Sequence, residues 1–118
     1  MTEPTTINMD DYGAWEWEGD SADWQHVVSI DPGLGYDWAT LHAFWSPSAR
    51  LYFWHGDGGC SCNGWGDDIC TEADMKSGDR NALLRAIREF AEDYPHYLYS
   101  ADVLDAVGAV RRFKEARA

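Results

Sequence analysis

Hydrophobic and polar residues alternate with a period of two along much of the first half of the chain. The alternation begins at Trp15, where tryptophan and glutamate take turns over four positions, and it is interrupted by short segments rich in Gly, Pro, Asp and Ser. This period is typical of strands with one buried face, and the interruptions are typical of turns. The pattern predicts four strands, over residues 15–18, 24–30, 36–45 and 51–55, with the last two forming a hairpin.

The period changes to three or four residues after Gly78, as expected for helices. Asp79 is a suitable N-cap for the first helix, which ends before Pro95, and Ser100 is a suitable cap for the second. The apolar stripes are Leu83, Leu84, Ile87, Phe90 and Ala91 in the first helix, and Val103, Ala106, Val107, Val110 and Phe113 in the second.

The order of these elements predicts an α+β fold. We expect an antiparallel meander sheet of about four strands, followed by two C-terminal helices packed on one face. The chain has 118 residues, which suits one domain. Residues 1–11 are polar and lack periodicity, so they predict a flexible N-terminal arm, and residues 12–118 form the single domain.

The charge of the chain is strongly negative and unevenly distributed. Asp and Glu number 21 against 9 Lys and Arg, a net charge of −12, and the first 49 residues contain no Lys or Arg. Such a surface repels nucleic acid and anionic membranes, so we expect neither as a direct partner, whereas a basic protein surface would be attracted. The start of the chain does not resemble a signal peptide, and no apolar run is long enough to span a membrane. The odd number of cysteines suits a reducing cytosol.

The Gly-rich stretch over residues 56–68 has the composition of an ordered loop or a metal-binding knuckle. A zinc ion accepts three cysteines and one histidine as ligands, and glycines allow the backbone to fold around it. The alternatives are that the cysteines are buried structural residues, that the histidine is an ordinary strand residue, and that the carboxylates are solvated in turns. The sequence gives no support for a disulfide between Cys60 and Cys62, for an iron–sulfur cluster or for an EF-hand calcium site. The candidate zinc ligands are His55, Cys60, Cys62 and Cys70.

The Gly59-Cys60-Ser61-Cys62 segment, entered from an aromatic strand and followed by Trp65 and Asp67-Asp68, resembles a signature in a family of small actinobacteriophage proteins. The resemblance covers about residues 36–93, including the helix after Asp79. It implies a phage protein acting in the cytoplasm of a bacterial host, and it brings no assigned activity. Only Cys60 and Cys62 match the signature, which weakens the zinc hypothesis and favours a tight structural turn with buried thiols.

The sequence contains no recognisable catalytic motif, so we expect a binding protein and not an enzyme. The preferred hypothesis is an accessory protein that binds and modulates a host protein through an acidic and aromatic surface. A zinc-stabilised domain is one alternative, and a nucleic-acid mimic that uses Asp10, Asp11, Glu16, Glu18, Asp20 and Asp23 is another. Core packing of the tryptophans and solubility from the charge are the simpler explanations. The candidate partner-binding residues are Trp15, Glu16, Trp17, Glu18, Trp65, Asp67 and Asp68.

Overall fold

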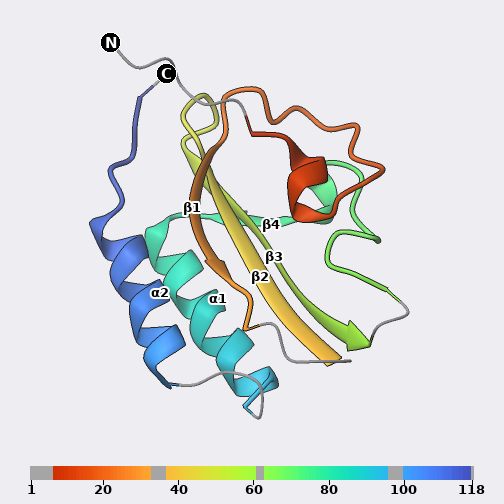
Figure 1. The fold of residues 1–118 in the computed structure, drawn as a ribbon. Coiled ribbons are helices and arrows are strands. Elements are labelled where there is room, and N and C mark those ends of the chain that lie inside the picture. The colour runs from red at the N-terminus through yellow and green to blue at the C-terminus, as the bar shows by residue number, and fades with distance from the viewer. Residues whose placement is uncertain (1–6, 33–36, 61–62, 96–99, 118) are drawn as a thin grey trace.

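The computed structural model describes residues 7–32, 37–60, 63–95 and 100–117. Within them, an antiparallel sheet of four strands in the order β1-β2-β3-β4 is followed by two helices, α1 and α2 (Figure 1). This confirms the predicted α+β meander with two C-terminal helices. The strands are β1 (Gln25–Ile30), β2 (Asp37–Ser46), β3 (Leu51–Cys60) and β4 (Lys76–Gly78), and the helices are α1 (Arg80–Asp93) and α2 (Ser100–Arg112).

One of the four predicted strands is absent, and one strand of the sheet was not predicted. The Trp15–Glu18 segment forms turns and no strand, although its residues alternate. The fourth strand of the sheet is instead β4, whose three residues are too few to show a period. It pairs with Tyr52–Trp54 of β3, which precede it by more than twenty residues in the sequence.

The Gly-rich segment was expected to be a loop, yet its first five residues, 56–60, continue β3. A Cβ atom at Gly56 would collide with the ring of Phe90, and one at Gly58 would collide with the ring of Tyr94. The glycines are therefore required by the close approach of the end of α1 to the strand, and they do not interrupt the strand.

A β-bulge in β1 decides which of its side chains face which side of the sheet. His26 is opposite Phe44, but Val28 is opposite Ala43, so the register shifts at Val27. Strict alternation would place His26 on the same face as Val28. The extra residue turns His26 to the other face of the sheet.

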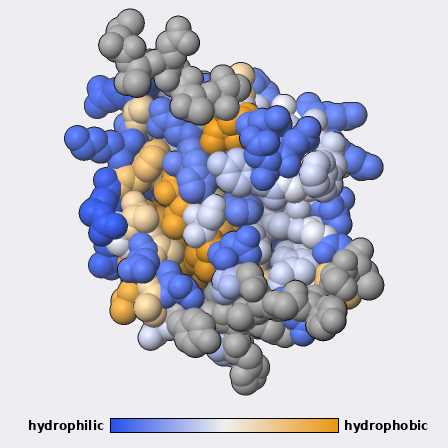
Figure 2. Space-filling model, in the orientation of Figure 1, coloured by the Kyte–Doolittle hydropathy of each residue, from blue (hydrophilic) through white to orange (hydrophobic). Residues whose placement is uncertain are grey.

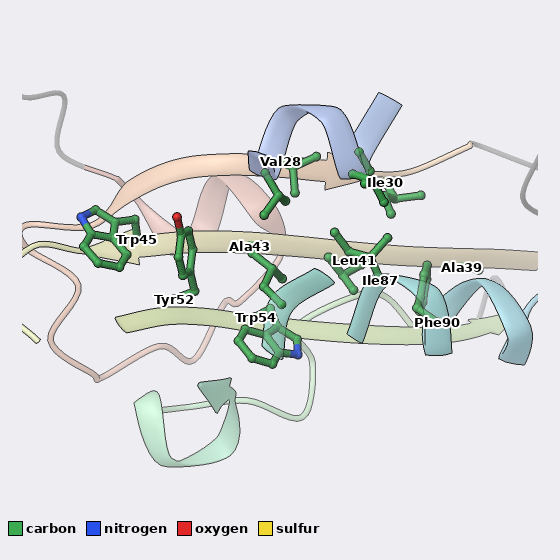
Figure 3. Packing of buried hydrophobic residues seen from close by; sticks show 14 residues of the cluster. Val28, Ile30, Ala39, Leu41, Ala43, Trp45, Tyr52, Trp54, Ile87 and Phe90 are labelled. Atoms are coloured by element: carbon green, nitrogen blue, oxygen red, sulfur yellow. The ribbon is translucent and has the colours of Figure 1, made fainter. Parts of the chain in front are cut away.

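The sheet is covered on both faces, by different kinds of structure. Helices α1 and α2 cover the face that we call the helix face, and residues 7–24 together with residues 63–75 cover the opposite face, which we call the coil face (Figure 1). Figure 3 shows the core of the helix face, where Leu41 and Ala43 of β2 and Trp54 of β3 meet Ile87 and Phe90 of α1. The core of the coil face consists of Met9, Ala14, Trp24, Phe44, Trp65, Ile69 and Met75.

The two helices follow the expected local chemistry. The Asp79 side chain accepts a hydrogen bond of 2.8 Å from the Ala82 amide, as an N-cap does. Leu83, Ile87 and Phe90 are the buried residues of α1. Hydrophobic side chains gather at the surface where α2 meets β1, framed by hydrophilic residues (Figure 2). Among the helices that the structure describes, none is both long and apolar enough to cross a membrane.

Residues 1–11 were expected to form a flexible arm, but residues 9–11 belong to a helical turn packed on the sheet. A short 3₁₀ helix, η1 (Met9–Tyr12), lies on the coil face, and Met9 is fully buried there; residues 1–6 lie outside the described residues. Gly13 and Gly66 have positive φ angles of 109° and 90°, and a Cβ atom on Gly66 would lie 2.8 Å from the Ala14 amide nitrogen. Glycine is needed at both positions because the backbone at Gly13 and Ala14 is in contact with the backbone at Trp65 and Gly66.

Candidate functional site

The turn that follows η1 carries the most exposed large hydrophobic side chain described in the structure. Trp15 is 72 % exposed, and its neighbours Glu16 and Glu18 are also exposed. Trp17 is half-buried, because its ring packs against Trp24 with the ring centres 5.6 Å apart. Of the two tryptophans, Trp15 therefore faces solvent and Trp17 anchors the turn.

A second segment supports this turn from behind. The Glu18 amide donates a hydrogen bond of 2.7 Å to the Cys70 carbonyl, and the Asp20 amide donates one of 2.6 Å to the Glu72 carboxylate. A shallow hollow forms where the two segments meet, lined by Trp15, Glu16, Trp17, Glu18 and Cys70. We call this hollow and its rim the Trp15 surface.

The charged side chains that act on Cys70 at the Trp15 surface are carboxylates. Partial burial and the carboxylates of Asp74, Glu16 and Glu18 raise the pKa of the Cys70 thiol. The thiol is therefore kept protonated, which is the opposite of what a reactive cysteine needs. A cation would be attracted to the same place.

Trp65 does not belong to an exposed binding surface, contrary to the sequence-based hypothesis. It is only 5 % exposed, and its indole N–H donates a hydrogen bond of 2.7 Å to the His55 carbonyl. Its ring meets the ring of His42 edge to face, with centres 4.6 Å apart. Trp65 thus fastens the loop to the sheet, because the indole satisfies a strand carbonyl while its ring fills the core.

The two carboxylates that follow Trp65 have different surroundings. Asp67 is exposed and accepts a hydrogen bond of 2.8 Å from the Gly64 amide, as turn aspartates commonly do. Asp68 is also exposed, and its Oδ1 lies 3.4 Å from Nε2 of His55. Only Asp68 of this pair is directed toward another ionisable side chain.

The four proposed zinc ligands are not assembled by the described residues. His55 and Cys60 are five residues apart on β3, which corresponds to about 16 Å along a strand and to opposite faces. Cys70 lies at the Trp15 surface, and Cys62 lies outside the described residues. In the part of the chain that the structure describes, the group that could hold a metal ion is His55 with Asp57 and Asp68. Asp57 and Asp68 were interpreted from the sequence as solvated turn carboxylates, because the zinc hypothesis drew its ligands from cysteine and histidine only.

A polar network that the sequence pattern does not reveal joins the buried His42 to the exposed Ser29 and His26. The Ser29 hydroxyl lies 2.6 Å from Nδ1 of His42 and 2.7 Å from Nε2 of His26. Burial is the main cause that lowers the pKa of His42 to about 4, with Asp31 opposing and His26 adding to the effect. We interpret the network as structural, because the hydroxyl is already engaged by two rings and Tyr12 packs on both rings, which joins the edge of the sheet to η1. Only the bulge in β1, which alternation does not reveal, brings His26 to this place.

Comparison with known proteins places the chain in a family. Residues 21–117 match the family described as Domain of unknown function (DUF7574), and since the match covers most of the chain, the protein belongs to that family. Searches of curated proteins and of solved structures found no match. The family description assigns no activity, and the resemblance to actinobacteriophage proteins stays a prediction.

Proposed function

We propose that this protein is a binding domain that docks a basic segment of a partner protein on the Trp15 surface. The observation that carries the proposal is the 72 % exposure of Trp15 beside two exposed glutamates. Tryptophan is over-represented among the residues that dominate binding energy, because its large ring buries much apolar area on contact.

The support behind the turn favours binding with little rearrangement. Trp17 is packed against Trp24, and the Glu18 amide is bonded to Cys70. These contacts hold the backbone that carries Trp15, so a partner would not have to order it. Less ordering on binding leaves more of the interaction energy as affinity.

The charge of the surface favours a basic partner. Glu16 and Glu18 lie on its rim, and the nearest charged groups acting on Cys70 are all carboxylates. Opposite charges increase the rate of encounter and set specificity, while a central apolar contact supplies affinity. If the resemblance to phage proteins extends to function, the partner is a protein of the bacterial host cytoplasm.

Mimicry of nucleic acid is the alternative function that the negative charge suggests. One of the carboxylates assigned to the mimic, Asp23, has a structural role instead. The Asp23 carboxylate accepts hydrogen bonds from the Ser46 hydroxyl and the Ser48 amide, where it holds the turn between β2 and β3. These contacts lower the pKa of Asp23 against the opposing effect of burial. Asp23 is thus fixed in place by the hairpin turn, which favours the aromatic mode of docking over mimicry.

The test is a titration with a short Arg- and Lys-rich peptide that carries one central Leu, followed by NMR of the backbone amides of residues 15–20. We expect Trp15→Ala to weaken binding at least about tenfold, since loss of such a residue commonly costs about 2 kcal/mol. Glu16→Gln with Glu18→Gln should weaken binding mainly at low salt.

Matched controls come from the helices. Leu104 is 70 % exposed on α2, so Leu104→Ala removes a comparable exposed side chain elsewhere, and Glu89→Gln with Glu92→Gln removes two exposed carboxylates from α1. Both controls should bind as the unaltered protein does. Binding that ignores Trp15→Ala but disappears with salt would replace the proposal with charge mimicry, and equal losses in the controls would refute a specific surface.

A further inference from the structure

We propose that His55, Asp57 and Asp68 form a binding site for one divalent transition-metal ion of the Zn²⁺ type. His55 and Asp57 come from β3, and Asp68 comes from the turn after it. One atom of each side chain lies within 4.8 Å of the other two. The site is separate from the Trp15 surface and does not depend on the proposed function.

The distances between the donor atoms suit a metal ion. Nε2 of His55 lies 3.4 Å from Oδ1 of Asp68 and 3.9 Å from Oδ2 of Asp57. Ligands bound to zinc at about 2.0–2.1 Å in a tetrahedron are separated by about 3.4 Å. The His55–Asp68 pair already has this spacing, the His55–Asp57 pair needs a movement of about half an ångström, and the two carboxylate oxygens lie within 4.8 Å of each other.

The imidazole nitrogen at the centre of the cluster has no hydrogen-bond partner among the residues that the structure describes. Nε2 of His55 is buried, and the whole side chain is only 16 % exposed. The neighbouring carboxylate oxygens are near it without hydrogen-bond alignment. In the neutral ring with its proton on Nδ1, the Nε2 lone pair and the two carboxylates repel one another, so a cation between them would remove both the repulsion and the missing contact.

Surrounding contacts hold the three ligands in place. The Asp57 Oδ1 atom accepts a hydrogen bond of 2.8 Å from the Gly58 amide, which leaves Oδ2 directed toward His55. The ring of Trp65 packs edge to face on the His55 ring, with centres 5.5 Å apart. Such second-layer contacts orient ligands and increase metal affinity.

The donor set selects the class of ion. An imidazole ligand favours Zn²⁺ and its first-row neighbours over Mg²⁺ and Ca²⁺, which prefer oxygen alone. Two carboxylates balance the charge of a divalent ion, and in the described residues neither one pairs with a Lys or Arg. Asp68 is exposed, so water can reach the site and complete the coordination.

The experiment is a calorimetric titration of Zn²⁺ alone into the full chain after treatment with a chelator. We expect one ion per chain, and His55→Gln and Asp68→Asn should each reduce affinity at least about tenfold, because even second-layer changes cost 10–100-fold. Asp67→Asn is the matched control, since it removes a charge one residue away and keeps an oxygen for the Gly64 amide. It should bind Zn²⁺ as the unaltered protein does.

Co²⁺ absorption distinguishes this site from a cysteine site. Ligation by nitrogen and oxygen gives no thiolate-to-cobalt charge-transfer band, so its appearance, and its loss in Cys70→Ser, would overturn the proposal. Absence of saturable Zn²⁺ binding would also overturn it. Unchanged affinity in both ligand variants would do the same. Melting curves without metal check that the variants fold, and Asp68→Asn, at an exposed position, keeps the test valid if His55→Gln does not.

Discussion

The helix face and the coil face of the sheet bury side chains of different kinds. On the helix face, regular helices satisfy their own backbone groups, and most of the buried core residues are aliphatic, with Trp45, Tyr52, Trp54 and Phe90 among them (Figure 3). On the coil face the covering segments have only short 3₁₀ turns, and large rings fill the irregular space. Phe44, Trp24 and Phe53 stack there, with the Trp24 and Phe53 ring centres 4.7 Å apart.

The irregular cover also explains where the polar chemistry lies. Amide groups outside helices and strands need side-chain partners, and carboxylates supply several of them on the coil face. Asp74 accepts hydrogen bonds from the Cys70 and Thr71 amides, and this lowers its own pKa. Part of the negative charge of the chain thus stabilises the irregular backbone of the coil face. The same irregular cover brings ionisable side chains to that face, where a ligand can reach the exposed ones.

The largest expected effect tests whether both faces belong to one cooperative unit. Phe44 and Ile87 are completely buried, on the coil face and the helix face respectively. Phe44→Ala should lower the free energy of unfolding by about 3–5 kcal/mol and Ile87→Ala by about 2–5 kcal/mol, through lost burial and a residual cavity. Urea denaturation measures both. A Phe44→Ala protein of unaltered stability would mean that the coil face folds separately.

The next effect concerns the helix face, where Arg80 ties the C-terminal segment to α1. Its guanidinium donates hydrogen bonds to the Arg111 and Phe113 carbonyls and forms a 3.1 Å ion pair with Glu115. Arg80→Ala should cost roughly 2–3 kcal/mol of stability, because charge-assisted bonds are lost and two carbonyls are left unpaired. Arg80→Lys should recover little, since a single ammonium cannot reach the same partners. Full recovery by lysine in urea denaturation would show that charge alone matters.

The coil face should make the protein sensitive to mild acid. The pKa of His42 is about 4 when folded, so below its ordinary value near 6.5 the unfolded chain takes up a proton that the folded chain does not. Stability should therefore fall as pH drops from about 7 to 5, by about 2 kcal/mol from this group. His42→Gln should reduce that pH dependence, whereas Ile87→Val on the helix face should keep it. Denaturation at the two pH values decides, and an equal slope in His42→Gln would contradict the assignment.

The smallest effect separates binding from stability. Trp15 is mostly exposed, so Trp15→Ala should change the free energy of unfolding by no more than about 0.5 kcal/mol. Trp65→Ala, at a buried position of the same coil face, should cost about 3–5 kcal/mol. Thermal melts of the two variants provide the comparison. A large loss in Trp15→Ala would indicate a structural role and would weaken the proposed docking surface.

The sequence by itself determined the elements whose signals are local. The apolar stripe with Asp79 at its start predicted α1, the polar turn between two aromatic runs predicted the β2–β3 hairpin, and their order predicted the fold class. These predictions succeeded because a helix cap, a helical period and a short hairpin involve residues that are neighbours in the chain.

Only the tertiary structure decided which side chains meet across the coil face. The alternation at Trp15 resembled a strand, but the strand partner of β3 comes from residues 76–78, after a long return of the chain. Trp65 is buried and Trp15 is exposed, although both lie beside carboxylates and glycines in the sequence. His55 meets Asp68 because Trp65 is anchored to the His55 carbonyl. Burial and such contacts depend on the position of distant segments, which a pattern of nearby residues does not contain.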